Sequence, residues 1–135
     1  MSKPSKEVIE LSRRLHDLGV RKEPEVGDWE VYDWLPGNRT GPPSLYLIEH
    51  EAHIAQFNQS ITRTHFIIPP LEWCLEWLRE RGLVSVESQS KNPVWAGVWI
   101  PVDRENIKEW KCAEADTPYL AILKAMVAVK EAGND

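Results

Sequence analysis

The sequence predicts a single α+β domain in which three helices pack on one mostly antiparallel, four-stranded sheet, in the order α-β-β-α-β-β-α. Three observations support this prediction. The chain has 135 residues, which is enough for one domain with its own core. Three segments repeat apolar residues every three or four positions, and four shorter segments alternate β-branched or aromatic residues with others. We therefore treat residues 1–135 as one unit.

The three helical segments carry signals for their ends as well as an apolar stripe. The first begins after Ser5, a favourable N-cap, and ends at Gly19, which can adopt the left-handed backbone that terminates a helix. The second follows Pro70 and ends before Gly82. The third begins at Thr117 and is so rich in apolar residues that we expect it to be the most buried element.

Four segments between the helices are predicted as strands, because β-branched and aromatic residues alternate in them: 28–35, 44–50, 83–89 and 94–102. The last of these is apolar on both faces, which is typical of an inner strand. Residues 51–63 are polar and weakly patterned, and residues 64–68 fit a short additional strand.

Composition excludes several classes of protein. Hydrophobic residues make up 42% and charged residues 27% of the chain, as in ordinary soluble domains. The net charge is −5 and the basic residues are scattered, so we do not expect a nucleic-acid partner. No apolar run approaches the ~20 residues that cross a bilayer, and the first ten residues are polar, so we expect no membrane association and a cytoplasmic location.

The order of motifs along the chain points to a known group of proteins. Residues 15–20 read Leu-His-Asp-Leu-Gly-Val, a proline-led leucine helix spans 70–78, and an alanine-rich helix begins within 116–125. In this order the motifs resemble small uncharacterised α+β proteins encoded by bacteriophages and by prophage regions of bacterial genomes. The resemblance covers most of the chain, apart from longer loops at 36–43 and 51–63. It implies a bacterial host cell and transfers no catalytic residue.

Seven tryptophans in so small a domain are its most unusual feature. Trp73 and Trp77 lie one turn apart beside the leucine stripe of the second predicted helix, and Trp95 and Trp99 share one strand face. These pairs either fill the space between sheet and helices or form a surface patch for a protein partner or a second copy. We take the four as a candidate interface, with at least one of Trp73 and Trp77 accessible. The sequence thus favours a non-enzymatic protein-interaction module.

An enzyme is the alternative hypothesis. Glu49, His50 and His53 could form the site of a small enzyme that acts on a nucleotide or another small molecule. The histidine spacing differs from the helical zinc-protease pattern, and nothing supplies a full ligand set, so we expect no metal and no cofactor.

The two cysteines are expected to be free. Cys74 falls in the apolar stripe of the second predicted helix and is interpreted as a small buried hydrophobic residue. Cys112 falls in a polar connector, and a disulfide between the two is not expected in a reducing cytoplasm.

Overall fold

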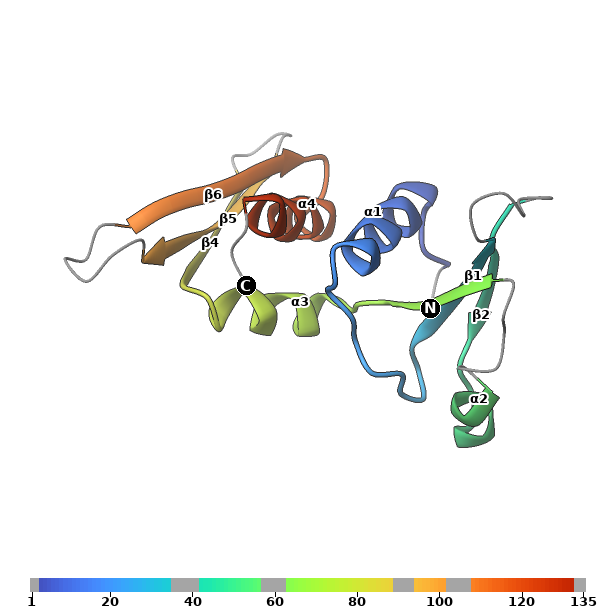
Figure 1. Ribbon diagram of the computed structural model, residues 1–135. Helices are drawn as coiled ribbons and strands as arrows, with labels where there is room; N and C mark the ends of the chain where they lie inside the picture. Colours follow the sequence, from blue (N-terminus) through green and yellow to red (C-terminus); the bar gives the residue numbers. More distant parts are fainter. Residues whose placement is uncertain (1–2, 35–41, 57–62, 89–93, 102–107, 133–135) are drawn as a thin grey trace.

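The structure, a computed structural model, describes residues 3–34, 42–56, 63–88, 94–101 and 108–132. Figure 1 shows the arrangement of its helices and strands. In chain order these are α1 (Lys6–Asp17), β1 (Trp29–Trp34), β2 (Ser44–Leu47), α2 (Glu51–Gln56), β3 (Arg63–Ile68), α3 (Leu71–Arg79), β4 (Leu83–Ser88), β5 (Val94–Pro101), β6 (Lys108–Ala115) and α4 (Pro118–Glu131).

The α+β class is confirmed, but the prediction of a single four-stranded sheet is wrong. The strands form two antiparallel three-stranded sheets, β2-β1-β3 and β4-β5-β6. Residues 64–68 do belong to a strand, β3, which pairs with β1. The polar connector before the last helix is a further strand, β6, which pairs with β5 along its whole length. A short helix, α2, lies in the segment that showed no clear pattern.

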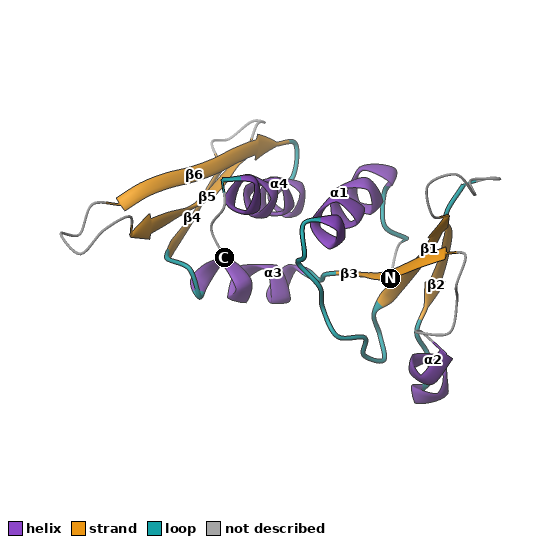
Figure 2. Cartoon of the chain, in the orientation of Figure 1, coloured by secondary structure: helices purple, strands orange, loops and turns teal. Residues whose placement is uncertain are grey.

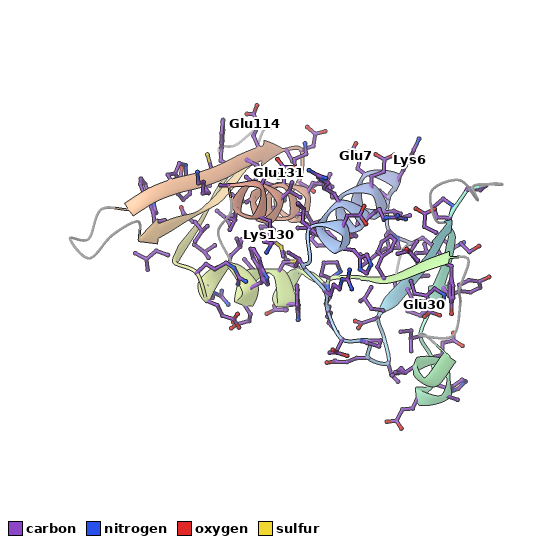
Figure 3. All side chains as sticks on the ribbon, viewed as in Figure 1. Lys6, Glu7, Glu30, Glu114, Lys130 and Glu131 are labelled. Carbon is purple, nitrogen blue, oxygen red and sulfur yellow. The ribbon has the colours of Figure 1, made fainter. Side chains whose placement is uncertain are left out.

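Helices α1 and α4 lie between the two sheets, as Figure 2 shows. Helix α1 packs on β3 and on α4, and α4 packs on α3 and on all three strands of its own sheet. Buried side chains from both sheets and from these helices form one continuous core. Arg14 of α1 and Glu131 of α4 form an ion pair 2.8 Å long at the surface of this contact, and Figure 3 labels Glu131.

Helix α4 is the central element of the core, as its composition predicts. Six of its residues are buried: Ala121, Ile122, Leu123, Ala125, Met126 and Val129. They occupy more than one side of the helix, so α4 can contact a sheet and two helices at once.

The expected helix ends are present. The Ser5 and Thr117 hydroxyls each accept a backbone N–H bond of 3.2 Å from the first turn of their helix. After α1, Gly19 adopts a positive φ of 93°, and the Val20 N–H donates back to the Leu15 carbonyl at 2.9 Å. This turn sends the chain from α1 toward β3, where the segment after Gly19 lines a cavity described below.

Candidate interaction surface

The sheet β4-β5-β6 has one face packed on α4 and one face open to solvent. Along β5, Val94, Ala96 and Val98 are buried in the core. Because successive side chains of a strand point to opposite faces, Trp95 and Trp99 lie on the other side. Each of these two indoles is 43% exposed.

The strand register decides which residues accompany these tryptophans. Trp99 is paired with Leu83 of β4 and with Trp110 of β6, and cross-strand partners share a face. Leu83 is 64% exposed, and the Trp99 and Trp110 rings lie 5.0 Å apart at an interplanar angle of 34°. The result is an apolar, largely aromatic surface across three strands.

Gly97 makes room for the Trp110 ring. A Cβ added at Gly97 would lie 2.8 Å from the Cη2 atom of Trp110 and 2.5 Å from the Lys111 carbonyl oxygen. The Trp110 indole therefore lies across the backbone of β5, between the positions of Trp95 and Trp99. A side chain at Gly97 would displace it, so this glycine helps to keep the surface flat.

The other end of the surface is acidic. Trp95 is paired with Glu87 on one side and with Glu114 on the other. Both glutamates are exposed, and Figure 3 shows Glu114 directed away from α4. Neither carboxylate forms an ion pair with another residue of the described part of the chain. We call the surface formed by Leu83, Glu87, Trp95, Trp99, Trp110 and Glu114 the outer aromatic face.

The structure separates the four tryptophans of the predicted interface into two groups. Trp95 and Trp99 belong to the outer aromatic face. Trp77 is only 8% exposed, and the Arg81 guanidinium lies over its ring, 3.4 Å from the ring centroid. Trp73 is half-buried and packs against the core. Trp77 is therefore buried and Trp73 is partly covered, whereas Trp95 and Trp99 are open to solvent.

Leu83 and Trp110 are the apolar residues of this surface that sequence reasoning misses, and Glu87 and Glu114 are the charged ones. The pattern places Leu83 at the start of a strand, but its face cannot be decided without a register. Trp110 falls in a segment that reads as a connector. The alternation of Trp110, Cys112 and Glu114 with Lys111, Ala113 and Ala115 is the available signal.

The alternative site near Glu49 falls only partly within the described residues. Glu49 and His50 are exposed just before α2, and the side chain of His53 lies outside the described residues. Among the side chains that are described, no group of three or more His, Cys, Asp or Glu residues is placed to hold a metal ion.

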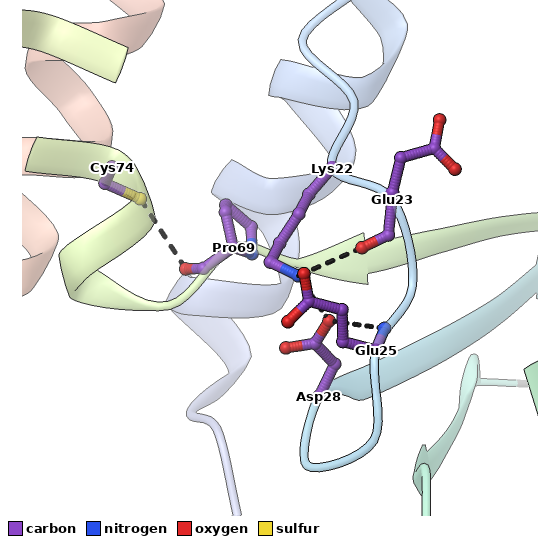
Figure 4. Close-up of polar contacts among 6 residues, drawn as sticks. All are labelled: Lys22, Glu23, Glu25, Asp28, Pro69 and Cys74. Atoms are coloured by element: carbon purple, nitrogen blue, oxygen red, sulfur yellow. Dashed lines mark hydrogen bonds and ion pairs between the residues drawn. The ribbon is translucent and has the colours of Figure 1, made fainter. Parts of the chain in front are cut away.

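The two cysteines are free, in contrasting surroundings. Cys74 is fully buried and burial raises its pKa to about 12, while its Sγ lies 3.5 Å from the Pro69 carbonyl oxygen (Figure 4). The Tyr119 hydroxyl donates to the same carbonyl, so α3 and α4 both attach to the end of β3. Cys112 is half-buried on β6 and is paired with Gly97, which places it beside the outer aromatic face.

This difference predicts the thiol chemistry of the native protein. Because the thiolate is the reactive form, Cys74 should stay inert at mildly alkaline pH and Cys112 should react with a disulfide reagent such as dithiobis-nitrobenzoate. We expect one thiol to react rapidly with the reagent in the native protein and two thiols to react rapidly after denaturation. Cys112→Ser should abolish the fast reaction, and a fast thiol that survives in this variant would contradict the assignment.

Comparisons with known proteins add no relatives. No protein-family model matches the chain, and no curated protein or solved structure matches it significantly. Within the described ranges, no helix has the length and apolar character needed to cross a membrane.

Proposed function

We propose that this chain is a non-enzymatic protein-interaction module and that the outer aromatic face is its contact surface. The observation that carries the proposal is the exposure of Trp95 and Trp99, 43% each, on a sheet face opposite the core. Tryptophan, tyrosine and arginine are enriched among the side chains that dominate binding energy. The resemblance to phage and prophage proteins supports a setting inside a bacterial host cell.

The size of the surface supports the same proposal. A tryptophan can bury ~150–250 Å², and since Trp95 and Trp99 are each 43% exposed and Leu83 is 64% exposed, the exposed apolar surface amounts to roughly a few hundred Å². Exposed patches of roughly this size on soluble proteins mark interaction sites more often than chance. The Trp99 and Trp110 rings already contact one another at 5.0 Å, so little side-chain freedom would be lost on binding.

The charge of the surface favours a partner segment that combines apolar side chains with arginine or lysine. A cation placed over Trp95 would contact the indole and would lie between the carboxylates of Glu87 and Glu114. A second copy of this chain fits less well, because each copy carries a net charge of −5 and the face itself is acidic at one end.

The test compares the wild type with Trp95→Ala/Trp99→Ala as bait for proteins of a bacterial host, followed by binding measurements with the purified partner. We expect the double variant to stay folded and to lose affinity by roughly a hundredfold or more, since two interface anchors are removed. Tyr46→Ala is the matched control, because Tyr46 is 52% exposed on the other sheet.

The position of Cys112 gives a second measurement of the same binding. Because Cys112 is paired with Gly97, a bound partner should slow the alkylation of its thiol. The proposal is refuted if a purified partner binds the wild type and Trp95→Ala/Trp99→Ala equally well. It is also refuted if Cys112 reacts as fast in the complex as in the protein alone. If sedimentation shows that the wild type is a dimer and the double variant is not, the occupant of the surface is a second copy of this chain instead of a basic partner.

A further inference from the structure

A cavity of about 350 Å³ lies beside β3, in the part of the fold that contains the first sheet. Its wall is formed by the end of α1, the segment after Gly19, α2 and β3. We call it the β3 cavity. Its volume is in the range of sites that hold small molecules.

The floor of the β3 cavity is the edge of a strand. His65, Phe66 and Ile67 are consecutive and all line the cavity, although their side chains alternate between the two faces of the sheet. Such a run can line one cavity only along the edge of the strand. In the order β2-β1-β3, β3 pairs with β1 on one side, so its other edge faces the cavity and offers backbone hydrogen-bonding groups.

The chain after α1 forms the opposite wall and brings two cations to it, Arg21 and Lys22. The charge of Lys22 is already compensated, as Figure 4 shows: its Nζ lies 2.6 Å from Asp28, 3.8 Å from Glu25 and 2.9 Å from the Glu23 carbonyl oxygen. Arg21 has no ion-pair partner within the described ranges. The Arg21 guanidinium is thus the cation on this wall that is available to bind an anionic ligand.

His16 lies on the same wall, and its pKa depends on the charges around the cavity. Burial and the Arg21 guanidinium lower the pKa of His16, with a smaller contribution from Arg13, and only Asp17 acts in the opposite direction. The cations therefore outweigh the anions at this ring. His65 lines the cavity from β3, and its ring packs on Tyr32 at a centroid distance of 4.0 Å.

The lining is mixed, and polar atoms make up the larger part of its exposed surface. Val20, Pro24 and Ile54 contribute apolar side chains in addition to Phe66 and Ile67. Glu23 also lies on the lining, as an exposed carboxylate that points away from Lys22 in Figure 4. A ligand that fits this wall has one negatively charged end and a small apolar body that contacts the apolar part of the lining.

We propose that the β3 cavity binds a small organic anion, with its apolar body against Pro24 and Ile54 and its carboxylate or phosphate on Arg21 and the β3 edge. Arginine suits this role because its planar fork matches both anions. This inference does not depend on the function proposed for the outer aromatic face, since the two surfaces involve different sheets.

The test uses benzoate, adenosine monophosphate and inorganic phosphate as probes, with calorimetry for affinity and the imidazole NMR signals of His16 as a local readout. We expect at least one organic anion to saturate the protein below about 10 mM and to raise the pH at which His16 titrates. Benzoate and the nucleotide distinguish a carboxylate from a phosphate ligand. Inorganic phosphate should bind more weakly, because it lacks the apolar body.

Arg21→Ala should weaken binding about tenfold or more, and Arg79→Ala, an exposed arginine on α3, should leave it unchanged. Glu23→Gln should strengthen it about two- to threefold, because a repelling charge is removed. The proposal fails if none of the probes saturates by about 10 mM, if Arg21→Ala binds as well as the wild type, or if inorganic phosphate binds as tightly as the organic anions.

Discussion

Leu123→Ala is expected to lower the free energy of unfolding by about 3–5 kcal/mol. Leu123 is fully buried on α4, the helix that contacts both α1 and the β4-β5-β6 sheet. Its truncation removes apolar contacts and leaves a cavity, and the surrounding elements cannot all move inward because α4 is held by several of them at once. Urea denaturation followed by circular dichroism measures the loss.

Leu83→Ala is the matched control for this experiment. It deletes the same atoms from a side chain that is 64% exposed, so we expect a change below about 1 kcal/mol. A loss below about 1 kcal/mol for Leu123→Ala as well would show that α4 is not central to the core.

Gly82→Ala should destabilise the protein by about 3 kcal/mol or more, although it adds only one carbon. The new Cβ would lie 1.8 Å from the Trp99 carbonyl oxygen and 2.8 Å from its carbon, both of them backbone atoms. A flexible side chain could move aside, but here the backbone of β5 or the turn after α3 must shift. Thermal and urea unfolding of the purified variant test this expectation.

Gly19→Ala separates this steric effect from the ordinary cost of replacing a glycine. Gly19 has a positive φ of 93°, but an added Cβ would meet no described atom within 4 Å, so only backbone strain of about 1 kcal/mol is expected. If Gly82→Ala and Gly19→Ala lower the free energy of unfolding by the same amount, the close approach of Gly82 to β5 adds no steric cost and the expectation is wrong.

The longer helices could be predicted because their signals are local. Ser5, Gly19 and Thr117 mark helix ends through bonds to neighbours within one turn, and the apolar stripes follow the helical period. Strand β6 could not be recognised in the same way. It contains charged residues and alanine, which are poor strand formers, and it exists because β5 pairs with it at every position. Because β6 was not expected, the second three-stranded sheet was not expected either.

The candidate site shows the same limit. The spacing of Trp95 and Trp99 places them on one face of a strand, but which face is open depends on α4, far along the sequence. The leucine stripe of α3 places Trp73 and Trp77 on its flank, where at least one of them is expected to be accessible. Arg81, one turn further, folds back so that its guanidinium covers the indole and also donates to the Trp77 carbonyl at 2.7 Å. An apolar stripe does not indicate such cover.

The contact between α1 and α4 has a consequence for synthesis on the ribosome. Each sheet is assembled from consecutive segments of the chain, but α1 packs on α4, which is synthesised after both sheets. Arg14 and Glu131, which pair across that contact, are separated by 117 residues. At typical translation rates the delay is on the order of ten seconds. Until then α1 is an amphipathic helix that has at most β3 to pack on, so the part of its apolar surface that α4 covers is open to a chaperone.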